Sequence, residues 1–219
     1  MTKNSNSQYN VHHIVRTLEV DIVLGRLYPR ERLIEEQLAK RFKTTRHVVR
    51  QALLELEIHG LVVREANKGA TVSEYSAEEV NQLYQMREFV ERQAAELIPL
   101  PVSVTSWQQL KKICDSHADA IENKDMIHVV AANKKFHQVL YRLCGNHFLA
   151  DVIDEMAKKA NLVRFTSGTD FGFLQQARDE HYEVLEALQK DNNEALAEIC
   201  IKHLQPSWQL YLEKRGHLG

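Results

Sequence analysis

The sequence predicts a mainly α-helical protein in which three helices and a β-hairpin precede an all-α antiparallel helical bundle. In residues 10–75, apolar side chains recur at helical spacing except in one alternating segment around Asn67-Lys68-Gly69. From Ser76 onward the spacing is only helical, and turn-forming residues divide the chain into helices. A length of 219 residues suits two domains. We therefore expect domains at 10–75 and 76–219, after a disordered segment at 1–9.

The N-terminal domain is predicted to begin with three helices. The first runs from about Val11 to a stop at Gly25, and a short second helix begins near Glu35. The third follows Thr44 and Thr45, and either hydroxyl can cap it by accepting from unpaired amides of the first turn. Its apolar stripe leaves a polar face on the other side. That face is formed by Arg46, His47, Arg50 and Gln51.

The segment LVVREANKGATV at 61–72 indicates two short strands around a turn in which Asn67 and Gly69 tolerate positive φ. A helix-turn-helix followed by a hairpin is the order of elements in a winged helix-turn-helix, whose second helix enters the DNA major groove. Lys68, at the tip of the hairpin, would reach a flanking phosphate or the minor groove. Gly69 would allow close backbone approach.

The chemistry of the third helix favours double-stranded DNA as the partner. Residues 40–50 contain five Lys or Arg residues, one His and no acid, which concentrates positive potential on a small face. Arg46 and Arg50 lie four residues apart, so both can donate to guanine edges or phosphates. Thr45 and His47 are placed for phosphate or base-edge contacts. Taken singly, each residue could be solvated surface, but together they predict a DNA-binding face.

The second domain is predicted to be entirely helical, beginning with a capping box formed by Ser76 and Glu79. The expected helices are 77–98, 106–122, 125–143, 147–165, 171–190 and 192–212. Cys114, Cys144 and Cys200 are odd in number and lie in apolar helical context, which favours reduced core thiols over disulfides or zinc ligands.

Histidines of the second domain indicate a candidate metal site. Asn133 and His137 lie four residues apart on one helix face, while His181 and His203 lie on two successive helices that a short turn would make antiparallel. Three neutral imidazoles that converge in a bundle suit Zn or Ni. The alternative is that each histidine is an ordinary hydrogen-bonded core residue.

Two function classes are less favoured on sequence grounds. No run of eighteen apolar residues exists, and the start MTKNSNSQYN lacks the apolar stretch of a signal peptide, so we expect a cytoplasmic protein with no membrane partner. A metal-dependent enzyme using His137, His181 and His203 is the alternative function. It is not favoured, because no HExxH-like helix supplies a general base and no other catalytic motif is present.

Three segments carry a family resemblance: LGRLYPRERLIEEQLAKRF, TTRHVVRQALLELEIHGLVV and ANKGATV. They resemble the N-terminal domain of the GntR family of bacterial regulators, and the helical remainder resembles the ligand domain of its FadR branch, called FCD. The resemblance covers about Val11 to Leu212. It implies a homodimeric, ligand-responsive regulator, most often a repressor, that binds a pseudo-palindromic operator. The DNA contacts that it implies are Thr45, Arg46, His47, Arg50, Lys68 and Gly69.

The chain departs from the family pattern at several positions near the DNA. The family usually has Pro-Gly at Pro29-Arg30, Thr-Pro at His47-Val48, Glu at Gln51 and often Arg at Glu36. Operator sequence can therefore not be transferred from relatives, because His47 and Glu36 are expected close to the DNA.

The resemblance extends to the effector domain. Many FCD domains bind a metal through D-x-x-x-H and two later histidines, which here become Asn133, His137, His181 and His203. Because Asn133 replaces the anionic Asp, weaker metal binding is expected. Arg87 matches an arginine common on the first FCD helix, where it can pair with the carboxylate of an effector, here expected to be a small organic acid. An intrahelical pair with Glu91 is the alternative.

Overall fold

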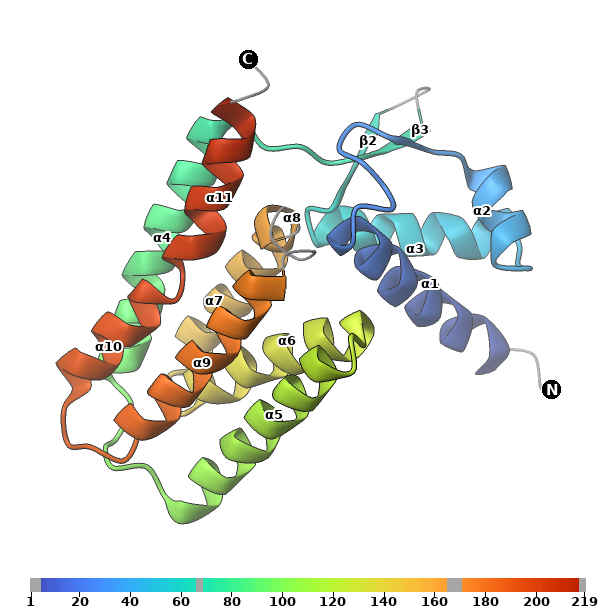
Figure 1. The fold of residues 1–219 in the computed structure, drawn as a ribbon. Helices are drawn as coiled ribbons and strands as arrows, with labels where there is room; N and C mark the ends of the chain where they lie inside the picture. The colour runs from blue at the N-terminus through green and yellow to red at the C-terminus, as the bar shows by residue number, and fades with distance from the viewer. Residues whose placement is uncertain (1–4, 66–68, 165–170, 217–219) are drawn as a thin grey trace. The chain divides into compact units, whose positions relative to one another are not determined.

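The computed structural model describes residues 5–65, 69–164 and 171–216, and the chain forms two compact units (Figure 1). The first unit spans residues 1–76 and the second spans 77–219. Helices dominate both units, and the small sheet belongs to the first. This is the predicted class, a winged helix-turn-helix followed by a helical bundle.

The described residues of the first unit form three helices and a three-stranded sheet. Its elements are α1 (Ser5–Val23), β1 (Arg32–Leu33), α2 (Glu35–Arg41), α3 (Arg46–Ile58), β2 (Val62–Glu65) and β3 (Gly69–Val72). The strands are antiparallel in the order β1-β3-β2, with Thr71 of β3 opposite Arg32 on one side and Val63 on the other. Strand β1 was not predicted, because two residues are too few to show alternation. Residues 5–9 were expected to be disordered. Helix α1 starts at Ser5, so these residues are helical.

The core of the first unit forms where α1 packs on α3. Ile14, Leu18 and Ile22 of α1 are buried, as is the apolar stripe of α3, which consists of Val48, Val49, Ala52, Leu53 and Leu56. Thr45 caps α3, its hydroxyl accepting a hydrogen bond from the backbone N–H of Val48 at 3.4 Å. Because the stripe faces α1, the polar side of α3 has to face away from the core.

The described residues of the second unit form helices. Its helices are α4 (Ala77–Glu96), α5 (Val104–Glu122), α6 (Met126–Arg142), α7 (His147–Lys159), α8 (Asn161–Arg164), α9 (Phe171–Ala187), α10 (Asn193–Lys202) and α11 (Gln205–Gly216). The side chains of Ser103, Asp125, Asn146 and Asn192 accept backbone hydrogen bonds at the starts of α5, α6, α7 and α10. These caps set most of the turns.

Two of the predicted helices are each divided in the structure. The expected helix 147–165 is interrupted at Ala160, and the expected helix 192–212 is interrupted at His203 and Leu204. The second break has a clear cause. Pro206 has no N–H to donate, and its ring clashes with the carbonyl of residue 202, so α10 ends before it and α11 begins anew.

The bundle core gathers side chains from most of its helices. Helix α5 packs against α6 and α9, and α4 packs against α10 and α7. The largest cluster of buried side chains includes Leu110, Phe136, Leu140, Val184 and Leu196. Cys114, Cys144 and Cys200 are buried and free, and burial raises the pKa of Cys114 and of Cys200 to about 12. None of the helices within the described ranges is both long and apolar enough to cross a membrane.

The buried Asp21 fastens the end of α1 to α2. Its side chain receives hydrogen bonds from Arg26 and Arg41, although Asp21 itself is only 2% exposed. We expect Asp21→Asn to lower the free energy of unfolding by about 1–3 kcal/mol, because a buried acceptor loses the charge that strengthens both bonds. Urea unfolding measures this, with the exposed Asp191→Asn as control. Equal losses in the two variants would contradict the assignment.

Candidate DNA-binding surface and buried histidine site

The predicted DNA-contacting residues of the first unit lie together on the polar face of α3. The side chains of Arg46 and Arg50 are 61% and 53% exposed, and His47 beside them is exposed. Thr45, which caps the helix, is exposed at its start. The cap and the buried stripe fix the position and the rotation of the helix. The four residues therefore form one outward surface of the kind that enters a major groove.

Two acids of α2 contact the arginines of this surface, which the sequence did not indicate. Arg46 donates from Nη2 to Glu36 Oε2 at 2.8 Å, and Arg50 donates from Nε and Nη2 to both oxygens of Glu35 at 3.1 and 2.9 Å. The hydrogen bond from Arg50 lowers the pKa of Glu35 below its ordinary value. The partners lie 10 and 15 residues apart along the chain, so only the packing of α2 on α3 brings them together.

The hairpin residues predicted to contact DNA are described only in part. Gly69 begins β3, is exposed and has φ of +87°, which is a conformation that L side chains rarely adopt. A Cβ added there would come no closer than 3.9 Å to the Arg32 side chain, so the backbone angle rather than space requires glycine. Lys68 lies outside the described residues.

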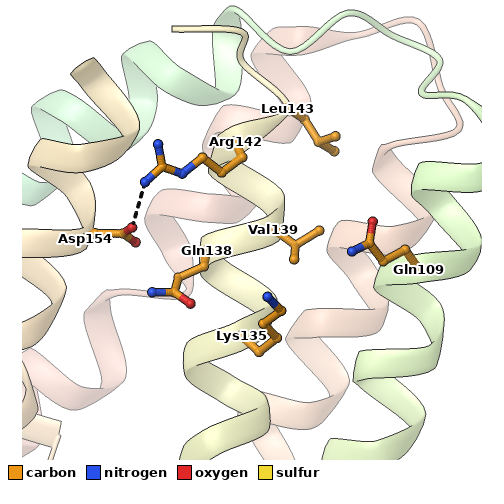
Figure 2. A pocket seen from close by; sticks show the side chains of 7 residues that line it. All are labelled: Gln109, Lys135, Gln138, Val139, Arg142, Leu143 and Asp154. Carbon is orange, nitrogen blue, oxygen red and sulfur yellow. Dashed lines mark hydrogen bonds and ion pairs between the residues drawn. The ribbon is translucent and has the colours of Figure 1, made fainter. Parts of the chain in front are cut away.

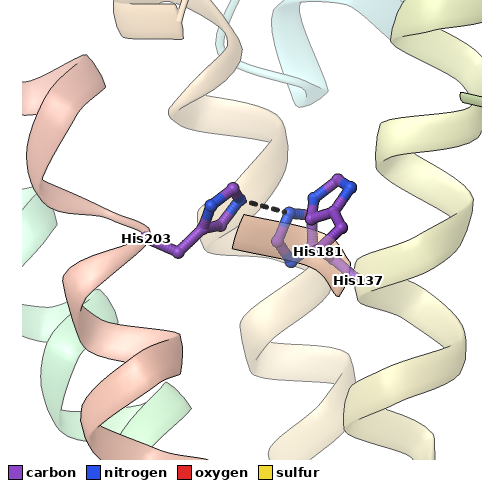
Figure 3. Close-up of side chains that lie close together, drawn as sticks. All are labelled: His137, His181 and His203. Atoms are coloured by element: carbon purple, nitrogen blue, oxygen red, sulfur yellow. Dashed lines mark hydrogen bonds between the residues drawn. The ribbon is translucent and has the colours of Figure 1, made fainter. Parts of the chain in front are cut away.

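In the second unit, His137, His181 and His203 converge from three places in the chain (Figure 3). His137 lies on α6, His181 lies on α9, and His203 is the residue that ends α10. One nitrogen of each ring lies within 4.8 Å of the others, and the Nε2 atoms of His137 and His203 are 3.3 Å apart. That separation is typical of neighbouring nitrogens on one divalent metal ion, since Zn–N bonds are about 2.0–2.1 Å long.

The ring nitrogens of this site are short of hydrogen-bond partners. His137 and His181 are 7% and 1% exposed. Within the described part of the chain, Nδ1 of His137 and both nitrogens of His181 have no partner. Burial, followed by the nearby charge of His203, lowers the pKa of both rings well below its ordinary value, so both are neutral. This differs from ordinary core histidines, whose nitrogens are satisfied, and it leaves lone pairs able to bind a cation.

Glu180 orients the third histidine. Its Oε2 lies 2.6 Å from Nδ1 of His203, and its Oε1 accepts a hydrogen bond from Gln176 at 2.9 Å. Burial raises the pKa of Glu180, but the hydrogen bonds of His203 and Gln176 outweigh burial and hold it below its ordinary value. With the carboxylate on Nδ1, Nε2 is the nitrogen of His203 that faces His137 and would bind a metal. Sequence spacing gives no signal for Glu180 beyond its place directly before His181.

Two further residues surround the cluster. His117 of α5 follows no ligand spacing in the sequence, yet it is 1% exposed and its ring centroid lies 5.0 Å from that of His181. Burial, and then the charge of His203, lowers the pKa of His117 to about 4. Asn133, the expected fourth ligand, lies one turn before His137 on α6 and is half-buried.

Arg87 of α4 is buried in a polar network. It is 1% exposed, donates from Nε to Glu91 Oε1 at 2.8 Å and lies over the ring of Tyr84, while Tyr141 donates to the other oxygen of Glu91. The expected alternative, an intrahelical pair with Glu91, is therefore present. The Nη1 atom of Arg87 still has no partner among the described residues. Burial, and then the charge of Arg87, lowers the pKa of Arg164 to about 10.

A small cavity adjoins the histidine cluster. Its volume is about 20 Å³, enough for one water molecule, and its lining includes His137, Arg164, Lys134 and Lys158. A more open pocket of about 370 Å³ lies along α6 (Figure 2). It is lined by Gln109, Lys135, Gln138, Val139, Arg142, Leu143 and Asp154. The two share Gln138 and Asp154, and Arg142 pairs with Asp154 at 3.1 Å.

The fold and these two sites define a class of protein, a DNA-binding regulator with a winged helix-turn-helix and a helical second domain. The chain belongs to the GntR family of bacterial regulatory proteins, whose family model matches residues 10–72, and it carries an FCD domain at residues 82–206. It is a transcriptional regulator and not an enzyme, so the metal-dependent enzyme considered above is set aside. FCD domains can bind metals, which agrees with the three clustered histidines.

Relatives of similar length support this assignment. The chain is 27% identical to an uncharacterized HTH-type transcriptional regulator, YdhC of Bacillus subtilis, over 82% of this chain and 80% of the relative. It is 26% identical to the HTH-type transcriptional repressor RspR of Escherichia coli, over 88% and 84%. The fold matches that of a GntR regulator from Rhodococcus sp. RHA1, with a TM-score of 0.75, 22% identity and coverage of 93% and 97%. It also matches Escherichia coli McbR, with a TM-score of 0.76, 19% identity and coverage of 94% and 98%.

The buried imidazoles predict a loss of stability in mild acid. Their pKa values are lower in the folded chain than the ordinary 6.5 of the unfolded chain, and that of His117 is about 4. The unfolded chain therefore binds more protons between pH 6.5 and 4. The contribution of these histidines to the free energy of unfolding is fully present above pH 6.5. It decreases as pH falls, by up to about 1.4 kcal/mol per pH unit for each histidine.

Urea unfolding with a chelator present, across that pH range, measures the slope. His117→Gln should show a shallower slope than the unsubstituted protein. An unfolding free energy that stays constant from pH 7 to pH 5 would contradict the assignment of these histidines as neutral and buried.

Proposed function

We propose that this chain is a ligand-responsive repressor that binds a pseudo-palindromic operator as a homodimer and is controlled by a small organic acid held with a divalent metal. The observation that carries the proposal is the outward face of α3, on which Arg46 and Arg50 are exposed four residues apart. The repressor RspR among its relatives favours repression. Such a regulator acts in the cytoplasm, where the bacterial chromosome lies.

In this proposal, α3 enters the major groove of each half-site. Arg46 and Arg50 read guanine edges through paired N–H donors, and Thr45 and His47 contact phosphates or base edges at the start of the helix. Lys68 and Gly69 of the hairpin bind the flanking backbone. A two-fold symmetric dimer places one winged unit on each half of a palindrome.

The metal in this proposal is bound by His137, His181 and His203, with Asn133 as a weaker oxygen ligand. Two observations support this: both ring nitrogens of His181 lack a hydrogen-bond partner among the described residues, and the Nε2 atoms of His137 and His203 lie 3.3 Å apart, as two nitrogens on one ion such as Zn or Ni would. When bound, the metal supplies a positive charge that attracts an anionic ligand. Glu180 holds His203 in the required tautomer.

The effector is proposed to be anionic because the surroundings of the cluster are basic. Arg87 has an unpartnered Nη1 atom, and Lys134, Lys158 and Arg164 line the adjoining cavity against one acid, Asp154. A cavity of about 20 Å³ has to widen to admit an organic acid. If the acid binds one conformation of the dimer better than another, operator affinity must change by the same factor.

Substitution of the α3 arginines tests the DNA-binding face. Arg46→Ala and Arg50→Ala should each lose on the order of 1–3 kcal/mol of specific binding, because each removes a paired donor to a base. Lys68→Ala should weaken binding on all sequences and flatten the salt dependence. Fluorescence anisotropy on a duplex that the protein selects from random sequence measures the losses.

The exposed Arg16 of α1 provides the matched control, because α1 packs on the apolar side of α3. Arg16→Ala should leave affinity for the selected duplex nearly unchanged. Equal losses on selected and scrambled duplexes for Arg46→Ala and Arg50→Ala would show that these residues contact phosphates rather than bases.

Zinc binding tests the histidine site. Zinc should raise the melting temperature of the chelator-treated protein, because only the folded chain brings His137, His181 and His203 together. His203→Ala should abolish most of that shift, while the exposed His128→Ala should retain it. The same shift in both variants would place the metal elsewhere.

Small carboxylates added to the zinc-loaded protein extend the test to the effector. An acid that raises the melting temperature further should also change affinity for the selected duplex. If every acid that stabilises the protein leaves that affinity unchanged, the proposed coupling is wrong.

A further inference from the structure

The recognition face of α3 carries its own counter-charges. Glu36 and Glu35 are adjacent on α2, and each is paired with a different arginine of α3, Glu36 with Arg46 and Glu35 with Arg50. Glu36 is 75% exposed, more than the arginine it contacts. DNA that reaches the arginines therefore also meets this carboxylate.

The pairing leaves a defined part of each guanidinium free. Arg50 uses Nε and Nη2 on Glu35, so its remaining donors lie at the Nη1 end of the group. Arg46 uses only Nη2 on Glu36, which leaves Nε and Nη1. On Arg50 the bidentate carboxylate restrains a long, flexible side chain in one orientation, and the Nη1 end becomes a preoriented donor. On Arg46 a single hydrogen bond tethers one end of the guanidinium group.

These acids contribute little to holding the unit together. Exposed ion pairs are worth about as much as they cost in side-chain order, and α2 is anchored independently by its buried Leu38. The position of Glu35 and Glu36 instead lowers the net positive charge of the α3 face. Two carboxylates close to two guanidinium groups cancel much of the attraction that a phosphate backbone would feel at any sequence.

We infer that Glu35 and Glu36 are positioning residues that determine operator specificity, by orienting Arg50 and Arg46 toward base edges and by weakening the binding of non-cognate DNA. The inference rests on the DNA contacts proposed for these arginines. On a cognate site, guanine accepts from the donors that each carboxylate leaves unoccupied, while the carboxylate keeps its own contact with the arginine. On other sequences only phosphate contacts remain, and the carboxylates oppose them.

The experiment compares Glu35→Gln and Glu36→Gln with the unsubstituted full-length protein. A duplex selected by the unsubstituted protein from random sequence and a scrambled duplex of the same composition are the probes, measured by anisotropy at several salt concentrations. Glu55→Gln is the control. It also removes one acid, but Glu55 of α3 is paired with His12 and not with Arg46 or Arg50. Thermal unfolding checks that each variant is folded.

We expect each α2 variant to bind the scrambled duplex about fivefold more tightly, the factor that corresponds to about 1 kcal/mol of repulsion at 4 Å in water. Affinity for the selected duplex should rise less or fall, so the ratio of the two affinities decreases. Selection repeated with Glu36→Gln should show relaxed base preference at the position read by Arg46. Glu55→Gln should change neither the ratio nor the selected sequence.

Two other outcomes are informative. A uniform charge effect would raise both affinities by the same factor. If the ratio of the affinities for the selected and scrambled duplexes is unchanged, the acids do not determine specificity. The inference is then wrong, while the proposed function stands. If the unsubstituted protein selects no sequence, base reading by Arg46 and Arg50 is wrong, and the inference falls with it.

Discussion

Each helix of this protein has to bury one apolar face, and the remaining features follow from which side chains that constraint turns outward or inward. In α3 the buried stripe packs on α1, so Arg46 and Arg50 have to face solvent. In the bundle, burial on several sides carries polar side chains into the interior. The same requirement therefore produces an exposed basic face in one unit and a buried polar cluster in the other.

The buried polar cluster is costly for the bundle by itself. His181 lacks partners for both ring nitrogens, and Arg87 lacks one for Nη1, within the part of the chain that is described. Each such atom forfeits hydrogen bonds that water would supply, at a cost of about 1–3 kcal/mol. The satisfied members, Glu91 with Tyr141 and Glu180 with His203, show that the interior can provide partners. The His181 nitrogens could be satisfied by a cation, and the N–H groups of Arg87 Nη1 could be satisfied by an anion.

The surface proposed to contact DNA shows the opposite balance, in which charge is exposed but already compensated. Arg46 and Arg50 retain free N–H donors while Glu36 and Glu35 occupy the others. A regulator has to find few sites among many, so weak attraction to arbitrary sequences is as useful as strong attraction to the operator. Pairs that add little to folding stability can therefore be important for binding.

The sequence by itself determined the helix-turn-helix, the hairpin, the helical second domain and the faces on which Arg46 and His137 lie, because periodicity and capping act over a few residues. Only the tertiary structure decided that Glu36 lies against Arg46, that Glu180 orients His203 and that His117 lies beside His181. It also supplied β1 and the break before Pro206. Contacts between helices depend on packing angles and on the rotation of each helix, and no short-range pattern in the chain specifies these.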